Sequence, residues 1–130
     1  SIDYLRSLNI VSEKVKIAIY QLLDESIIEN SQNFNLSQYL SNQLEMPYKK
    51  LSLLFSRQNG RTIENYFIVF KIERVKAMID DSDSTFTEIA IKLGYKSLSY
   101  LSRQFKAIEG LSMHDYKLKH QHSRKYLDKI

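Results

Sequence analysis

The chain contains no cysteine, which excludes disulfide bonds and thiolate chemistry and is typical of a protein in the reducing cytoplasm. One proline and three glycines in 130 residues leave few turn positions for hairpins, and alternating apolar and polar runs are absent. No apolar run approaches the roughly 18 residues of a membrane-spanning helix. The sequence begins with Ser1 and not with methionine or a signal peptide, so we expect a piece of a longer protein.

What the chain does contain is enough apolar material for packed cores. Hydrophobic residues make up 43% of the sequence, which excludes wholesale disorder. The net charge of +4 and the pI of about 9.2 are compatible with nucleic acid but do not require it. Catalysis has no support, because no glycine-rich phosphate loop, nucleophile elbow or convergent pair of acids is present. The sequence therefore predicts neither an enzyme nor a cofactor.

The stretch 86–105 predicts two helices joined by a tight turn. Apolar residues at helical spacing mark the first helix: Phe86, Ile89, Ala90 and Leu93. Gly94 permits the positive φ that the turn needs, and Ser97 is a good N-cap for the next helix. In that helix Leu101 and Phe105 point inward. The opposite face is small, polar and cationic, as a helix entering a major groove requires: Ser99, Ser102, Arg103 and Lys106.

Capping residues predict where the other helices begin. These are Ser12, Asn35, Thr62, Thr85 and Ser112, while Pro47 is expected to be the first residue of a helix. Apolar residues including Val15, Ile17 and Leu22 form the core face of the first helix, which the polar run 29–33 ends. The helix 63–79 is apolar on more than one face, which predicts a central helix that is shared between two lobes and packs against both.

The chain repeats itself. At an offset of 50 residues one set of positions aligns with another: Leu51, Ser52, Phe55, Gly60, Thr62, Ile63 and Tyr66 with Leu101, Ser102, Phe105, Gly110, Ser112, Met113 and Tyr116. At an offset of 49, Leu40, Ser41, Leu44 and Glu45 align with Ile89, Ala90, Leu93 and Gly94. The change of one residue falls in the turn. The sequence therefore predicts two helix-turn-helix units with a helix between them.

The predicted fold is all-α, with two helix-turn-helix subdomains joined by a central linker helix and about seven helices in total. The boundaries follow from the caps and the repeat. They are a linker from an upstream region at 1–11, the first subdomain at 12–62, the linker helix at 63–80, the second subdomain at 81–120 and a polar tail at 121–130.

This arrangement resembles the DNA-binding domain of the AraC/XylS family of bacterial transcription regulators. The motif that carries the resemblance is Ile89-Ala90, Leu93-Gly94-Tyr95, Ser99 to Lys106, Gly110-Leu111-Ser112 and Tyr116, and the likeness covers roughly 17–119. The resemblance implies a sequence-specific activator or repressor whose two recognition helices enter successive major grooves of double-stranded DNA. It also implies RNA polymerase as a further partner, an upstream sensor or receiver region, and dimerisation outside this chain.

The first unit departs from the second in two places. Glu45 stands where a turn glycine is usual, so the turn is expected to be strained or differently shaped. Leu53 stands where Arg103 stands in the second unit, and a leucine cannot bond to a guanine edge, though it can meet a thymine methyl. We expect the recognition helix of the first unit to anchor the protein on DNA more than it reads the base sequence. The predicted DNA contacts are Lys49, Lys50, Ser52, Leu53, Ser56, Arg57, Ser97, Ser99, Ser102, Arg103 and Lys106.

Other interpretations stay open or fail on the residues. Leu53 and Leu98 suggest a protein-interaction module as the alternative function. The acidic run 80–83 fails as a calcium loop, because Phe86 and Lys92 occupy the positions of its glycine and closing glutamate. His120 and His122 are expected to be solvent-exposed, so no metal site is predicted. Tyr95 and Tyr100 are expected to be packed, since duplex DNA hides its base faces.

Overall fold

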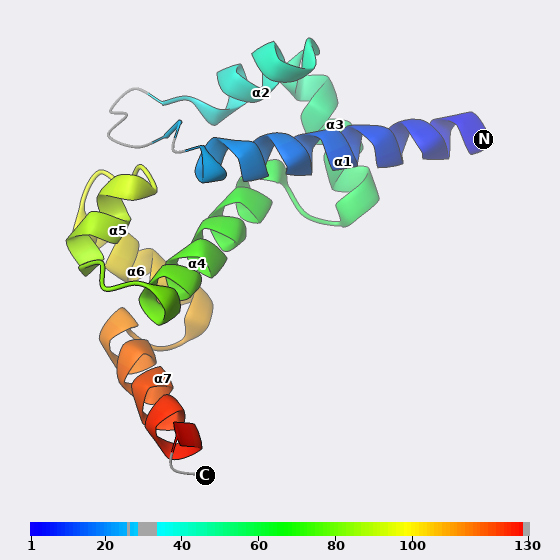
Figure 1. The fold of residues 1–130 in the computed structure, drawn as a ribbon. Helices are drawn as coiled ribbons and strands as arrows, with labels where there is room; N and C mark the ends of the chain where they lie inside the picture. Colours follow the sequence, from blue (N-terminus) through cyan, green and yellow to red (C-terminus); the bar gives the residue numbers. More distant parts are fainter. Residues whose placement is uncertain (26, 29–33, 129–130) are drawn as a thin grey trace. The chain divides into compact units, whose positions relative to one another are not determined.

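The structure is a computed structural model that describes residues 1–25, 27–28 and 34–128, with side chains to Gln121. These residues form seven α-helices and no strand, which confirms the all-α prediction (Figure 1). The helices are α1 (Ile2–Asp24), α2 (Leu36–Leu44), α3 (Tyr48–Asn59), α4 (Ile63–Asp81), α5 (Phe86–Lys92), α6 (Leu98–Glu109) and α7 (Met113–Asp128). The chain divides into two compact units, Ser1–Ile68 and Val69–Ile130.

The first unit is built on α1, which packs against α2 and α3. The sequence predicted that this helix begins at Ser12, and this is wrong, because residues 2–11 are already part of α1. The helix begins at Ile2, because the Ser1 side chain accepts a hydrogen bond from the Tyr4 amide at 3.2 Å. Ser12 is a good cap by residue type but lies in mid-helix, only 1% exposed, where its hydroxyl accepts a hydrogen bond from Asn59 Nδ2 at 2.9 Å.

The inward face of α1 is narrower than its apolar residues suggest. Val15, Ile19 and Leu22 are fully buried, as expected, but Ile17 is exposed. Ile17 lies on the side of the helix away from those residues. The helix ends at Asp24, and the polar run 29–33 that was predicted to end it lies outside the described residues.

The turn between α2 and α3 contains Glu45 with φ 54° and ψ 42°, the one positive-φ residue other than glycine in the described chain. Gly94, the equivalent residue of the second unit, has φ 75°. An equivalent backbone hydrogen bond closes each turn. Met46 N donates to Ser41 O at 3.3 Å in the first, and Tyr95 N donates to Ala90 O at 2.9 Å in the second. The first turn is therefore strained, and it shares with the second turn a left-handed residue and this closing hydrogen bond.

The second unit contains most of α4 together with α5, α6 and α7. Thr85 and Glu88 form the predicted capping box, with Glu88 N donating to Thr85 Oγ1 and Thr85 N donating to Glu88 Oε1. The α5 helix then packs on α6, and α6 on α7. The core is formed by apolar side chains from all four helices and the turn: Ile72, Val75, Ile79, Ile89, Ala90, Leu93, Tyr95, Leu101, Phe105, Met113 and Tyr116.

The repeat extends to the packing of aromatic rings. Phe55 and Tyr66 meet edge to face in the first unit, with ring centroids 5.5 Å apart. Phe105 and Tyr116, 50 residues later, meet in the same way at 5.7 Å. Each pair joins a recognition helix to the helix that follows it. The internal duplication in the sequence is thus a duplication of side-chain contacts.

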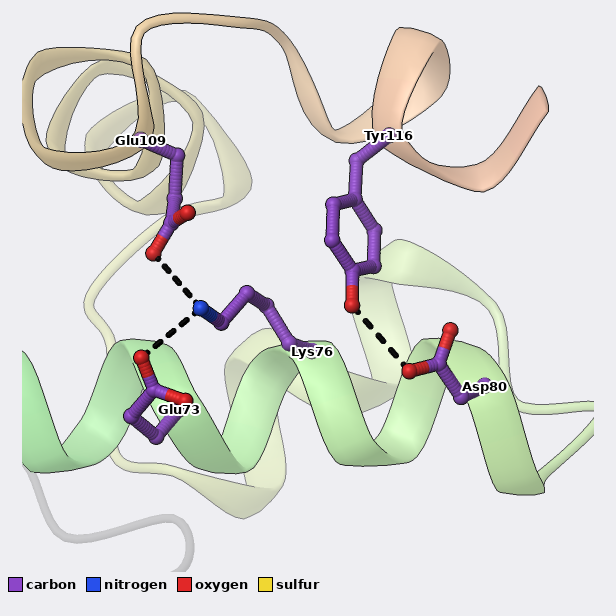
Figure 2. Close-up of polar contacts among 5 residues, drawn as sticks. All are labelled: Glu73, Lys76, Asp80, Glu109 and Tyr116. Atoms are coloured by element: carbon purple, nitrogen blue, oxygen red, sulfur yellow. Dashed lines mark hydrogen bonds and ion pairs between the residues drawn. The ribbon is translucent and has the colours of Figure 1, made fainter. Parts of the chain in front are cut away.

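Polar contacts on α4 hold the second unit at two points (Figure 2). Lys76 Nζ lies 2.7 Å from Glu73 Oε1 on its own helix and 3.0 Å from Glu109 Oε1 at the end of α6. One turn further along α4, Asp80 Oδ2 accepts a hydrogen bond from the Tyr116 hydroxyl of α7 at 3.1 Å. The helix α4 therefore holds both the recognition helix and the helix that follows it.

Candidate nucleic-acid interface

The second recognition helix, α6, is fixed at both ends by its own sequence. The Ser97 side chain accepts a hydrogen bond from the Tyr100 amide at 3.1 Å, which confirms Ser97 as the N-cap. Gly110 ends the helix with φ 80°, a left-handed cap that an L-residue adopts only with strain. Leu101 and Phe105 are fully buried, and burial of two such side chains contributes about 3–6 kcal/mol toward holding the helix in one rotation.

This rotation places the predicted DNA-contacting face in solvent. Ser97, Ser99, Arg103 and Lys106 are exposed, and Ser102 is half-buried at the margin. Arg103 and Lys106 have no hydrogen bond or ion pair to another side chain among the described residues. Both cations are therefore available to an external anion.

The acidic residue of α6 does not weaken this positive face. Glu109 is the helix's one acidic side chain, and the structure pairs it with Lys76 of α4. Its side chain is 19% exposed, well below the exposure of a free surface glutamate. The outer surface of α6 therefore carries Arg103 and Lys106 without a competing carboxylate nearby on the same helix.

The first recognition helix, α3, repeats the arrangement with different chemistry. Leu51 and Phe55 are fully buried, and Gly60 ends the helix with φ 69°. The opposite side carries the predicted contacts, of which Ser52 and Ser56 are half-buried and the others exposed: Lys49, Lys50, Ser52, Leu53, Ser56 and Arg57. Leu53 is 49% exposed, so the position equivalent to Arg103 presents a branched apolar group and no donor. The helix has three cations and no acidic residue.

Arg57 differs from the other predicted contacts because it has a partner in the described chain. Its Nη1 donates to the Tyr4 hydroxyl at 2.6 Å, and Tyr4 lies in the first turn of α1. The guanidinium is therefore oriented by a residue 53 positions earlier. Four of its five N–H donors stay available to another acceptor.

Two residues of the second unit were missed or misjudged by sequence reasoning. Tyr100 was expected to be packed, and this is wrong, because its side chain is 50% exposed on the outer side of α6. Gln104 was not considered, yet its Oε1 accepts a hydrogen bond from the Tyr95 hydroxyl at 2.5 Å. Spacing alone could have found Tyr100, since it lies three residues before Arg103 on the same stripe. Tyr95 itself is buried, as expected.

The described residues offer little support for other kinds of site. No three histidine, aspartate or glutamate side chains among them lie close enough together to hold a metal ion. His120 is exposed, and its Nδ1 lies 3.1 Å from Asp80 Oδ1, while the side chain of His122 lies outside the described residues. No described helix has the length and apolar character that crossing a membrane requires. Leu98, part of the alternative apolar surface, is half-buried.

A family model described as a helix-turn-helix domain matches residues 40–119, which is more than half of the chain. The search of curated proteins found no match. Among solved structures, the DNA-binding domain of AdpA, a global transcriptional factor in complex with a target DNA, is similar with a TM-score of 0.72 and 20% identity. That match covers 88% of this chain and 96% of the other.

Two domains of response regulators are similar as well. The C-terminal domain of yesN from Fusobacterium nucleatum has a TM-score of 0.64 and 24% identity, covering 78% of this chain and 96% of the other. The C-terminal domain of AraT from Geobacillus stearothermophilus has a TM-score of 0.67 and 19% identity, covering 82% and 84%. At these identities the likeness shows the fold.

Proposed function

The chain belongs to the AraC-type helix-turn-helix family, and from this premise we propose that it binds double-stranded DNA sequence-specifically as part of a transcription regulator. Proteins of this family are DNA-binding transcription regulators and not enzymes. The observation that carries the proposal is the outer face of α6, where Arg103 and Lys106 are exposed and unpaired on a helix locked by Leu101 and Phe105.

Within α6 we assign roles by chemistry. Arg103 contacts a base edge, because its guanidinium can donate two parallel hydrogen bonds to the O6 and N7 of guanine. Lys106 contacts a phosphate as a compact positive charge. Ser97, Ser99 and Ser102 are short donors and acceptors that reach either a base edge or the backbone.

The first unit positions the protein on the duplex more than it recognises the base sequence. Lys49, Lys50 and Arg57 neutralise phosphates, and each contact releases counterions and strengthens binding to any duplex. Ser52 and Ser56 add neutral backbone contacts, and Leu53 meets a thymine methyl. We propose that α3 and α6 enter successive major grooves, which requires two contacted half-sites about 10 base pairs apart.

The substitution Arg103→Ala tests the proposal. It should cost about 1–3 kcal/mol on the preferred duplex and relax selectivity at one base position, with little effect on random DNA. The preferred duplex comes from selection in a random pool, and binding of the variant and the parent is then compared by titration. Equal loss on preferred and random duplexes would show that Arg103 touches only the backbone.

A second candidate function, a protein-interaction module, has one observation in its favour: the half-exposed Leu53 at the centre of the outer face of α3. A gel-shift at low salt separates the two. Complexes with duplex that survive random competitor favour DNA recognition. No DNA complex at any salt, together with a stable complex with a protein, favours the module.

Further partners belong to the longer regulator of which we propose this chain to be a part. The similar domains from Fusobacterium nucleatum and Geobacillus stearothermophilus belong to response regulators. By this likeness we propose an upstream sensor or receiver region that also carries dimerisation, and RNA polymerase as a partner at the promoter. Mass measurement of the chain alone and bound to DNA tests the placement of dimerisation.

A further inference from the structure

A shallow hollow of about 280 Å³ lies on the outer side of α6, lined by Tyr100, Arg103 and Gln104. Their spacing of i, i+3 and i+4 puts the three side chains beside one another on the helix surface. Arg103 is a pure donor, since a guanidinium has N–H groups and no lone pair to offer. What the hollow can bind therefore depends on which way the Gln104 amide faces.

The structure fixes that amide from the inside. The Tyr95 hydroxyl donates to Gln104 Oε1 at 2.5 Å, so the oxygen faces Tyr95 and the NH₂ group is left for the hollow. Tyr95 is 8% exposed. Burial raises the pKa of Tyr95 above its ordinary value, so its hydroxyl stays protonated and remains a donor.

Tyr95 is in turn held by its neighbours. Lys71 of α4 places its Nζ 4.1 Å from the centroid of the Tyr95 ring, a cation–π contact. The centroid of the Tyr100 ring lies 6.1 Å from that of the Tyr95 ring, at an interplanar angle of 41°. A linked set of contacts thus runs from the central helix through the turn to the recognition helix.

The first unit has no counterpart of this link. Met46 and Leu54 stand where Tyr95 and Gln104 stand in the second unit, and neither can make the hydrogen bond. Leu54 is buried, whereas Gln104 is half-buried and reaches the surface. The hollow is therefore a feature of the second recognition helix and not of the repeat as such.

Resting on the proposed function, we propose that Arg103 and Gln104, beside Tyr100, form a subsite in which both of these side chains present only donors to a group of the duplex that offers acceptors alone, with Tyr95 as the positioning residue. A guanine edge, with O6 and N7, is such a group, and a backbone phosphate is the other. Adenine is disfavoured, because its N6 amino group needs the amide oxygen that Tyr95 holds. An unconstrained glutamine, by contrast, pairs well with adenine.

Two substitutions in the full chain test this proposal. Tyr95→Phe keeps the ring beside Lys71 but releases the Gln104 oxygen, so the preference for guanine over adenine at one position should fall about tenfold. Gln104→Met keeps the side-chain length without the amide, and it should weaken binding to the preferred duplex about three- to tenfold. Gln21→Met, an exposed change on α1, is the matched control and should change neither quantity.

The readout is base preference at every position, from selection in a random duplex pool followed by titration of the best site and its single-base variants. In the double variant, Tyr95→Phe should have no further effect once Gln104 is methionine, because the two act through one contact. If the two substitutions lower affinity equally for all duplexes, the subsite holds a phosphate and not a guanine.

The proposal is wrong if neither substitution changes affinity or base preference, or if the wild-type chain selects adenine there and loses it with Gln104→Met. In those cases the proposed function still stands, provided that Arg103→Ala reduces selective binding. If the wild-type chain prefers no duplex over random DNA, both proposals fail together.

Discussion

The strained turn of the first unit allows a stability prediction with a worked magnitude. Glu45 adopts φ 54° and ψ 42°, a left-handed conformation that costs an L-residue about 1–2 kcal/mol. Glycine would remove this cost but would lose about 0.5–1 kcal/mol through the greater freedom of the unfolded chain. The Glu45 side chain is exposed, so its removal breaks no packing. We expect Glu45→Gly to stabilise the first unit by about 0.5–1 kcal/mol.

Thermal unfolding followed by circular dichroism should show this as a rise in Tm of about 2–8 °C, given the size of the unit. Hydrogen exchange in α2 and α3 locates the effect in the first unit, where protection should increase. Glu45→Ala is the matched control: it removes the carboxylate but keeps the left-handed strain, and its stability should stay close to that of the parent.

The equivalent change in the second unit should have the opposite sign. Gly94 has φ 75°, so Gly94→Ala introduces there the strain that Glu45 already carries, and it should destabilise the second unit by about 1 kcal/mol. The reasoning is refuted if Glu45→Gly unfolds at or below the temperature of the parent while Glu45→Ala leaves it unchanged. That outcome would mean that the turn is not strained.

Two further predictions concern charge. Lys49→Ala should weaken binding to all duplexes alike and make the slope of log K against log salt shallower by about 0.9, and a loss confined to one sequence would contradict the phosphate role. Burial lowers the pKa of Lys71 from 10.5 to about 8, so between these values the unfolded chain binds more protons and stability should rise with pH. The rise is at most about 3 kcal/mol, less what the cation–π contact with Tyr95 contributes to the charged form, and Lys71→Met should remove it. Denaturant titration at pH 7.5, 9 and 10 measures the free energy of unfolding of the parent chain and of Lys71→Met. A pH dependence unchanged in Lys71→Met would contradict the assignment.

The two units share one architecture, yet their outer faces differ in chemistry. Leu53 and Arg103 occupy the same position of the repeat, one apolar and one a pure donor. A backbone duplicated to this degree tolerates such a change, because both side chains are exposed. We infer that α3 and α6 have separate tasks on DNA, anchoring and reading.

Helix ends and caps were the features that the sequence predicted most reliably. Gly60 and Gly110 end α3 and α6, and Thr62 and Ser112 cap the helices that follow, as predicted. These features depend on hydrogen bonds within one turn of the chain, which residue type and spacing specify directly. The start of α1 was misplaced, because Ser12 has the type of a cap but is used as a buried partner of Asn59, which no local pattern reveals.

What the sequence determined by itself is the order of the helices, the duplication, and the side of each recognition helix that faces outward, since apolar periodicity defines the buried face and leaves the rest to solvent. Only the tertiary structure decided how individual polar groups are used. It pairs Glu109 with Lys76, Arg57 with Tyr4 and Gln104 with Tyr95, contacts that span between 9 and 53 residues. Such pairings depend on how packed helices bring side chains within about 3 Å of one another, and a hydrogen bond requires that closeness.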